Sequence, residues 1–267
     1  MRRLAQLLLV DKEKLIFTEV TMSGHSKWNN IKNKKAKGDA ARSKIFTKIG
    51  REIAVAVKAG GSDPSSNSKL YDIIQKAKAN NMPNDNITRS IKKASGELST
   101  VDYVDIVYEG YGIGGSAVIV QCLTDNKNRT AGDIRCAFDK NGGSLGQTNC
   151  VSYMFDRRGI VIAENNINLD EDGAFELAIE AGADDVSLEE EGMVEITCDP
   201  SALSAVRDAV VAKGLNLVSA EFSWLPQTMV TLEGDNLAKF QHMLDVLEDN
   251  DDVQEVFHNV QLPEDDE

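Results

Sequence analysis

The spacing of hydrophobic residues changes at Gly96, and this change divides the chain into two kinds of structure. Before Gly96, apolar residues such as Ile45, Ile49 and Ile53 recur every three or four positions, which predicts helices with one buried stripe. After Gly96, short apolar runs bounded by glycine and polar residues predict strands that alternate with helices. A chain of 267 residues with this pattern is expected to form an α+β protein of several domains.

Three helices are expected before Gly96. The first covers residues 40–59, and the second follows Ser66 or Asn67, either of which can cap a helix. Met82-Pro83 then interrupts the pattern, because the residue before a proline avoids the helical conformation, and a third helix follows Asn84. Burial of the three apolar stripes in one bundle leaves the intervening lysines outside.

The remaining chain contains three groups of elements. Residues 104–140 predict a strand-strand-helix unit, and residues 228–260 predict a strand-helix-strand unit. Between them the order approximates β-α-β-β-α-β, which is ferredoxin-like, with residues 151–155 and 159–163 expected to pair across a turn at Arg157-Arg158-Gly159. The two flanking units each need a partner to cover a sheet face, so we expect them to form one domain into which the ferredoxin-like domain is inserted.

The chain is expected to divide into three domains with a segment at each end. The first domain is a basic helical domain, residues 22–97, and the second is a discontinuous α+β domain, residues 98–147 with 227–262. The third, residues 148–226, is inserted into the second; an extension outside the fold, residues 1–21, and an acidic tail, residues 263–267, complete the chain. The extension precedes a second methionine, Met22, and lacks the long apolar region and cleavage site of a secretory signal. Its acidic residues also argue against a mitochondrial transit peptide.

Charge is divided along the chain as sharply as hydrophobicity. Residues 22–93 contain 16 Lys or Arg against 5 Asp or Glu, a net charge of +11, whereas residues 94–267 contain 9 against 35, a net charge of −26. Such a division predicts a basic domain that binds a polyanion, carried on an acidic body that does not. Nucleic acid is the expected partner.

Other classes of function find little support in the sequence. The glycines at 110, 112 and 115 match a dinucleotide-binding pattern, but a strand follows them instead of a helix, so a hairpin turn is expected. His25, His242 and His258 have no metal-ligand spacing and no cysteine partner. We therefore expect no enzyme activity, metal, cofactor or small-molecule substrate. The apolar runs are too short to span a membrane, and the four cysteines lack C-x-x-C spacing, as is usual for reduced thiols in the cytoplasm.

The candidate nucleic-acid contacts lie in the basic domain. They are His25, Lys27, Trp28, Lys32, Lys34, Lys35, Lys37, Arg42, Lys44, Lys48, Arg51, Arg89, Lys92 and Lys93. Trp28 lies between cations, where it either stacks on an unpaired base or packs against its own bundle. Of the 16 cations, 13 are lysines, which bind phosphate as point charges, so recognition of backbone and shape is favoured over base reading.

A second, smaller anion site is considered at Asn128, Arg129 and Thr130, where a polar segment opens a helix. Ordinary capping of that helix is the alternative explanation.

Several short motifs together resemble the YebC family. They are Gly24-His-Ser-Lys-Trp28, Lys44-Ile-Phe-Thr-Lys48, Arg51-Glu-Ile53, Asn81-Met-Pro83, Asp85-Asn-Ile87, Tyr108-Glu-Gly-Tyr-Gly112, Thr124-Asp-Asn126, Asn128-Arg-Thr130 and Gly142-Gly-Ser-Leu-Gly146. The resemblance extends from Met22 to near Pro263. It departs from the family pattern at Ile113, where proline is usual, and at Asn149-Cys150, where a glycine-serine pair is usual.

The resemblance implies three domains, the first helical and the others α+β. It also implies a cytoplasmic regulator, because members are described as probable DNA-binding transcriptional regulators, mitochondrial relatives as translational activators of cytochrome c oxidase, and bacterial members as factors that help ribosomes through proline-rich stretches. Three hypotheses follow: a ribosome- or RNA-bound translation factor, a DNA-binding transcriptional regulator, and an adaptor whose acidic sheets bind basic proteins.

Overall fold

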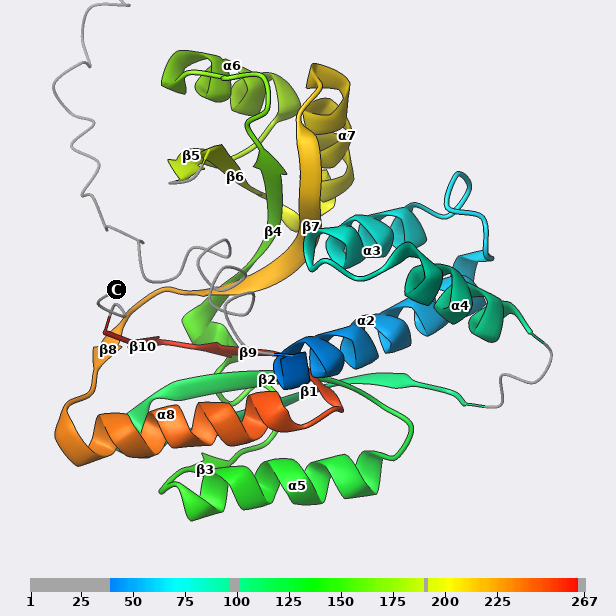
Figure 1. The fold of residues 1–267 in the computed structure, drawn as a ribbon. Coiled ribbons are helices and arrows are strands. Elements are labelled where there is room, and N and C mark those ends of the chain that lie inside the picture. The colour runs from blue at the N-terminus through cyan, green and yellow to red at the C-terminus, as the bar shows by residue number, and fades with distance from the viewer. Residues whose placement is uncertain (1–38, 97–100, 190–191, 264–267) are drawn as a thin grey trace, which may run out of the picture.

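The computed structural model describes residues 39–96, 101–189 and 192–263. Helices alone form its first part, and two parts built on sheets follow (Figure 1). The expected fold class, α+β with an N-terminal helical bundle and two α+β domains, is confirmed. The exact domain boundaries stay predictions.

The helical bundle consists of α2 (Asp39–Gly60), α3 (Ser68–Ala79) and α4 (Asn84–Ser95). The predicted stripes form its core, in which the most deeply buried side chains are Ile49, Ile53, Leu70, Ile73 and Ile87. Asn67, and not Ser66, caps α3: its Oδ1 accepts from the Leu70 amide at 3.1 Å, and its Nδ2 donates to the Ala56 carbonyl at 2.8 Å. One side chain thus starts α3 and binds it to α2.

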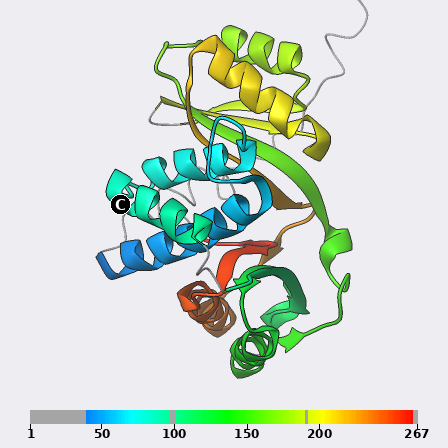
Figure 2. The same cartoon turned by 90° about the vertical axis from the view of Figure 1, so that its right-hand side faces the viewer.

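The central domain contains a sheet of order β3-β1-β2-β9. Its strands are β1 (Val104–Tyr111), β2 (Ala117–Thr124), β3 (Ser144–Leu145) and β9 (Val253–His258). Two helices, α5 (Lys127–Lys140) and α8 (Gly234–Asp249), lie side by side on one face of the sheet (Figures 1 and 2). Their apolar faces and the inner side chains of β2 form one continuous core.

The glycine-rich segment between β1 and β2 is the expected hairpin. The two strands pair antiparallel up to Tyr111 and Ala117, and the connection includes the short 3-10 turn η1 (Ile113–Gly115). Gly114 and Gly115 adopt φ of 69° and 77°, backbone angles that residues other than glycine rarely adopt. The glycines therefore serve the turn rather than a phosphate.

The ferredoxin-like domain contains β4 (Phe155–Glu164), α6 (Glu171–Ala181), β5 (Asp185–Glu189), β6 (Met193–Cys198), α7 (Leu203–Lys213) and β7 (Asn216–Pro226). Its antiparallel sheet has the order β5-β6-β4-β7. Both helices lie on one face, as the sequence order predicts. In chain order, the domain lies between β3 and β8 of the central part.

The predicted hairpin at Arg157-Arg158-Gly159 is wrong, because residues 155–164 form the single strand β4. Gly159 is not a turn residue; it pairs with Cys198 on one side and Phe222 on the other. A Cβ atom at Gly159 would lie 2.8 Å from the Cys198 Sγ, so the glycine permits close approach of the strands. Its sequence signal is the same as that of a turn.

Another difference concerns the chain after Pro226. The strand expected at residues 228–232 shortens to β8 (Val230–Thr231), which pairs in parallel with β10 (Val260–Gln261) in a separate two-stranded sheet. The paired strands β4 and β7 connect the ferredoxin-like domain to the central domain. At the end of this pair, Phe155 and Trp224 pack in one cluster with Ile119 and Phe257 of the central sheet.

Candidate nucleic-acid interface

The predicted contact residues fall into three groups. The first seven, His25, Lys27, Trp28, Lys32, Lys34, Lys35 and Lys37, lie outside the described residues. Arg42, Lys44, Lys48 and Arg51 belong to α2, and Arg89, Lys92 and Lys93 belong to α4. The structure therefore locates half of the candidate set.

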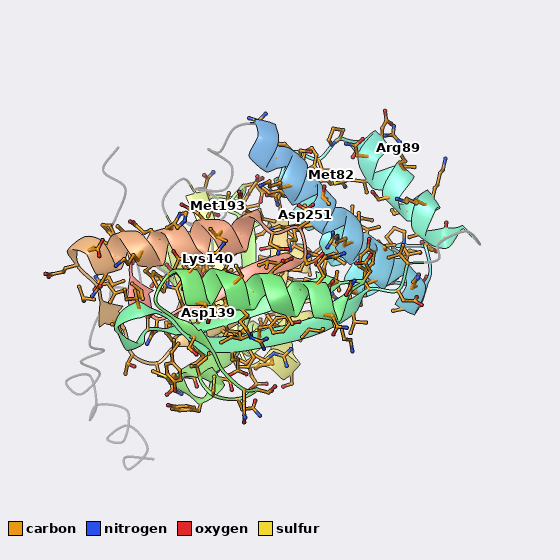
Figure 3. The ribbon with its side chains drawn as sticks, turned by 90° about the horizontal axis from the view of Figure 1, so that it is seen from below. Met82, Arg89, Asp139, Lys140, Met193 and Asp251 are labelled. Carbon is orange, nitrogen blue, oxygen red and sulfur yellow. The ribbon has the colours of Figure 1, made fainter. Side chains whose placement is uncertain are left out.

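The outer surface of α4 carries three exposed cations. Ile87 and Ala94 anchor the helix in the core, and the exposed positions Thr88, Arg89, Lys92 and Lys93 follow one another at helical spacing on the opposite side. Figure 3 shows Arg89 on this outer surface. Within the part of the chain that the structure describes, Arg89, Lys92 and Lys93 have no ion-pair partner. We call these three residues the α4 basic face.

The cations of α2 have a different environment, because they point toward the acidic body. Lys44 Nζ lies 2.8 Å from the Asp249 carboxylate, and Lys48 Nζ donates to the Glu248 carbonyl at 2.7 Å. Arg51 Nη1 donates to Asp252 Oδ1 at 2.5 Å and to the Leu123 carbonyl at 3.1 Å. Three predicted nucleic-acid contacts thus bind the helical bundle to the central domain, whereas Arg42 is exposed near the start of α2.

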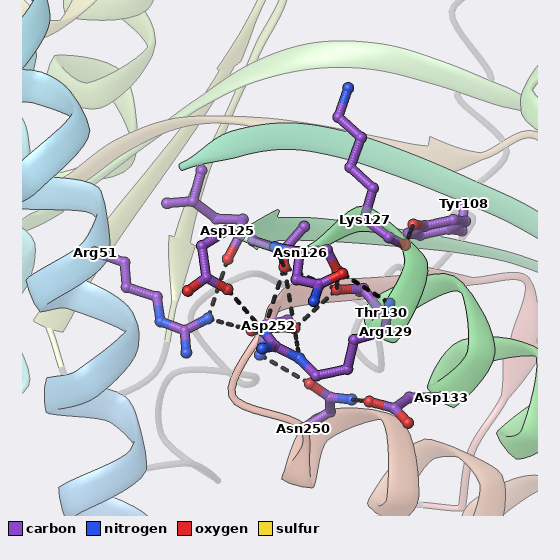
Figure 4. A network of polar contacts seen from close by, with 12 residues as sticks. Arg51, Tyr108, Asp125, Asn126, Lys127, Arg129, Thr130, Asp133, Asn250 and Asp252 are labelled. Atoms are coloured by element: carbon purple, nitrogen blue, oxygen red, sulfur yellow. Dashed lines mark hydrogen bonds and ion pairs between the residues drawn. The ribbon is translucent and has the colours of Figure 1, made fainter. Parts of the chain in front are cut away.

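Asp252 is the centre of this attachment (Figure 4). It lies in the α8–β9 connection with a side chain only 3% exposed, and it also binds Arg129, Thr124 and Thr130. The Arg129 Nη2 lies 2.7 Å from Asp252 Oδ2, and the Thr130 hydroxyl donates to the same oxygen at 2.8 Å. One carboxylate therefore joins α2, the end of β2 and the start of α5.

The charge state of Asp252 follows from this geometry. Burial by itself would raise the pKa of its carboxyl. The hydrogen bonds from Arg129, Arg51 and Thr130 outweigh burial and lower the pKa of Asp252 to about 2. The carboxylate is ionised at every pH at which the protein would work.

The second anion site considered at Asn128, Arg129 and Thr130 is occupied by the chain's own carboxylate. Arg129 and Thr130 bind Asp252, and Arg129 also bonds to Asp125 at 2.9 Å. The capping alternative also holds, through Asn126, whose Oδ1 accepts from the Arg129 amide at 3.1 Å. Asn128 lies exposed on the first turn of α5. The arrangement neutralises Arg129 within the chain.

A second attachment joins the bundle to the ferredoxin-like domain, and the sequence did not indicate it. Lys76 of α3 bonds to Glu52 at 2.9 Å and to Glu221 of β7 at 2.6 Å, and Arg207 of α7 bonds to Asp72 at 2.9 Å. Burial raises the pKa of Glu52, with Lys76 opposing the shift. Burial would lower the pKa of Lys76, but Glu221 and Glu52 raise it instead. The positive bundle is thus fixed to both acidic domains by specific ion pairs.

The open face of the ferredoxin-like sheet is also covered. Proteins with this topology can stack unpaired bases on exposed aromatic residues of the two central strands. Here the corresponding face carries Ile160, Ile162, Met193 and Val218, and Ala79 at the end of α3 packs against them. The bundle therefore occupies the surface on which bases would stack.

The described residues offer no other evident chemistry. They contain no group of three or more metal-ligating side chains, and no helix among them is long and apolar enough to cross a membrane. Burial raises the pKa of the Cys122 thiol to about 12 and that of Cys198 to about 11.

Fold and site together define a basic helical domain attached by ion pairs to two acidic α+β domains. The chain belongs to the TACO1/YebC family. The model of the TACO1/YebC N-terminal domain matches residues 26–97, and the model of the TACO1/YebC second and third domain matches residues 103–260. The resemblance identified from the sequence motifs is confirmed.

Curated relatives match nearly their whole length. A protein of Clostridium botulinum (strain Okra / Type B1), named probable transcriptional regulatory protein, is 56% identical over 243 residues, which cover 91% of this chain and 98% of the relative. The probable transcriptional regulatory protein ORF2U of Hathewaya histolytica is 54% identical with the same coverage. The crystal structure of the conserved hypothetical protein Aq1575 from Aquifex aeolicus, 40% identical, superposes with a TM-score of 0.74 and covers 86% of this chain and 94% of that one.

Proposed function

We propose that the protein is a nucleic-acid-binding regulator of gene expression that acts as a ribosome- or RNA-associated translation factor and assists synthesis through proline-rich stretches. The observation that carries the proposal is the α4 basic face, three neighbouring cations that are open to solvent, whereas Lys44, Arg51 and Lys76 of the same bundle bind acidic residues of the chain. The proposal places the protein in the cytoplasm and gives it no catalytic step.

The small number of arginines in the basic domain favours binding to RNA of defined shape over recognition of a particular DNA sequence. Base edges are read most specifically by bidentate arginines, and the basic domain has only three, at positions 42, 51 and 89. Arg51 is committed to Asp252 and the Leu123 carbonyl. Lysines therefore dominate the remaining surface, and they bind phosphates without reading the sequence.

DNA binding is the second candidate, and two observations favour it. Four residues, Asn80 to Pro83, connect α3 to α4, which is the length typical of a helix-turn-helix unit, and the basic face lies on the second helix. The curated relatives are also named probable transcriptional regulatory proteins. On this hypothesis α4 would enter the major groove.

Competition binding with the full chain separates the two candidates. Labelled ribosomal RNA bound to the protein is challenged with unlabelled ribosomal RNA or promoter DNA at equal phosphate concentration. We expect RNA to displace the label better, and we expect the protein to co-sediment with ribosomes at moderate salt, because shape adds to a shared electrostatic attraction. Tight binding to one duplex sequence without co-sedimentation would establish the DNA hypothesis instead.

Charge reversal tests the surface itself. Replacing Arg89, Lys92 and Lys93 together with glutamate should lower affinity by at least about tenfold and reduce the salt slope by about 2 to 3, since three phosphate contacts are lost. The matched control reverses three exposed cations of α5, namely Lys127, Arg135 and Lys140, and should change affinity little. Equal losses from both variants would show that only net charge matters and would reject the α4 basic face as the contact.

The cations before α2 are tested in the same assay. Lys27→Glu with Lys32→Glu should release the protein from ribosomes while the melting temperature stays unchanged. Trp28→Ala should weaken binding further if the indole stacks on a base. Unchanged co-sedimentation of the double variant would remove these residues from the proposed interface.

A further inference from the structure

The first helix of the ferredoxin-like domain, α6, exposes two large apolar side chains. Phe175 is 61% exposed and Ile179 is 63% exposed, and the two lie one helical turn apart. The opposite side of the helix, with Ala174, Leu177 and Ala178, is the side that is buried in the domain. Phe175 and Ile179 therefore do not serve the core. Single exposed apolar residues are common, but an adjacent pair that lines a groove is a feature of interaction surfaces.

The groove beside this pair is acidic. Its lining includes Phe175, Ile179, Asp170, Asp172, Glu176 and Glu180. Asp170 caps the helix, because its Oδ1 accepts from the Gly173 amide at 2.9 Å. Asp172, Glu176 and Glu180 have no ion-pair partner among the described residues. The groove thus combines an apolar pair with three carboxylates that the described part of the chain does not neutralise.

Helical spacing places these side chains in two neighbouring rows. Phe175 and Ile179 form one row, and Asp172, Glu176 and Glu180, at intervals of four residues, form the other. We call these five residues the α6 outer face. Like charges four residues apart destabilise a helix, and a carboxylate in the last turn, such as Glu180, also opposes the helix dipole. The acidic row therefore costs stability that a cationic partner would restore.

The part of the chain that contains α6 is acidic throughout. Residues 159–206 contain 13 Asp or Glu and no Lys or Arg. This charge would repel a nucleic acid and attract a positively charged segment of a protein. In Figure 1, α6 lies at the end of the ferredoxin-like domain that is away from the central sheet. The α6 outer face is therefore separate from the α4 basic face and opposite to it in charge.

We propose that the α6 outer face binds a basic amphipathic helix of a protein partner. Apolar side chains of that helix would pack on Phe175 and Ile179, and its lysines or arginines would pair with the acidic row. The apolar anchors would supply most of the affinity, and the charges would supply orientation and a high rate of association. The proposal adds a protein partner to the proposed function and does not depend on the nature of the nucleic acid.

Fluorescence anisotropy with the full chain tests the proposal. The probe is a labelled peptide of about 14 residues, roughly four helical turns, made of leucine and lysine with the leucines at helical spacing. The control peptide has the same composition in an order that removes the apolar stripe. At about 0.15 M ionic strength we expect saturable one-to-one binding of the first peptide and at least about tenfold weaker binding of the second. Equal binding of the two peptides, or no saturable binding, would overturn the proposal.

Variants of exposed residues locate the binding surface. Phe175→Ser with Ile179→Ser should weaken peptide binding by about tenfold or more while the melting temperature stays unchanged. Glu176→Gln with Glu180→Gln should weaken it less and should reduce its dependence on salt. The matched control is Val246→Ser, which changes an exposed apolar residue of another acidic helix, α8, and should leave binding unchanged. Equal losses from the control and the Phe175 and Ile179 variant, or no loss from either, would reject the α6 outer face.

Two further measurements separate this surface from the alternatives. The variant in which the α4 basic face is changed to glutamate should still bind the peptide, so failure of the nucleic-acid interface and failure of the α6 outer face are distinct results. Sedimentation velocity over a range of protein concentrations tests for a second copy on this surface. We expect the native protein and the Phe175 and Ile179 variant to have the same oligomeric state. Self-association that this variant abolishes would make a second copy the occupant and overturn the proposal.

Discussion

Replacement of Asp252 by asparagine should destabilise the protein much more than the same replacement of its neighbour Asp251 in the α8–β9 connection. The native environment lowers the pKa of Asp252 from 3.8 to about 2, and each unit corresponds to about 1.4 kcal/mol. Arg129 is 46% exposed, so solvent screening reduces this contribution to about 1 to 2 kcal/mol. This shift already includes the bonds from Arg51 and Thr130; asparagine costs roughly 1 to 2 kcal/mol more, because its NH2 group is a donor at a place where a carboxylate oxygen accepted bonds.

The expected total for Asp252→Asn is therefore about 2 to 4 kcal/mol, or a fall in melting temperature of roughly 5 to 15 °C for a chain of this size. Urea unfolding and thermal melts of the full chain measure it at neutral pH. Asp251→Asn is the matched control, because Asp251 is the exposed neighbour in the same connection (Figure 3). It should change stability by less than about 0.5 kcal/mol.

The pH dependence gives a second test with a definite sign. A carboxyl whose pKa is lowered by folding contributes stability fully above its unfolded value, 3.8, and loses that contribution as the pH falls toward 2. The difference between the native protein and Asp252→Asn should thus be constant from pH 8 to about 5 and should narrow below about 4. Equal stabilities of Asp252→Asn and Asp251→Asn at neutral pH, or a difference that widens in acid, would refute the assigned role of Asp252.

Three further results are expected. Lys76→Met should lower stability by about 3 to 5 kcal/mol at neutral pH, since two half-buried glutamates lose their shared cation. The loss should shrink as the pH falls, because burial raises the pKa of Glu52 and this carboxyl then takes up a proton. Lys78→Met, at an exposed position of α3, is the control in the same urea titration. A thiol reagent at pH 8 should modify exposed Cys136 well before Cys122 and Cys198, whose thiol pKa values are raised by burial. Mass spectrometry of partly labelled protein measures this order, and earlier labelling of Cys122 or Cys198 would contradict the prediction. Deletion of the N-terminal extension should leave the melting temperature and nucleic-acid affinity unchanged, and a loss of either would place it within the fold.

Local patterns were sufficient to predict most secondary structure. The apolar stripes between residues 40 and 91 predicted the three helices close to their observed bounds. Asn67 was one of two residues considered as the cap of α3, because an asparagine side chain can accept a hydrogen bond from the first turn of a helix. The Gly159 error shows where such patterns fail: a glycine that permits close contact between strands and a glycine that forms a turn have the same local sequence signature. Only the partner strand distinguishes them.

The candidate site divides in the same way. The excess of cations in residues 22–93, the preponderance of lysine and the exposed stripe of α4 could be read from the sequence, since charge and helical spacing are local properties. The assignment of Lys44, Lys48 and Arg51 to nucleic acid could not be checked there, because their partners are at least 72 residues away. Ion pairs between distant residues depend on how the domains pack.

For this protein, the sequence by itself determined the helices, the β-α-β-β-α-β order and the separation of positive from negative charge, because each depends on neighbouring residues or on composition. Tertiary structure decided how that charge is used. Packing brings Asp252 to Arg51 and Arg129, brings Glu221 to Lys76, and leaves the α4 basic face open. A cation is available to a ligand only when no carboxylate of its own chain lies within bonding distance, and that distance exists only in the folded molecule.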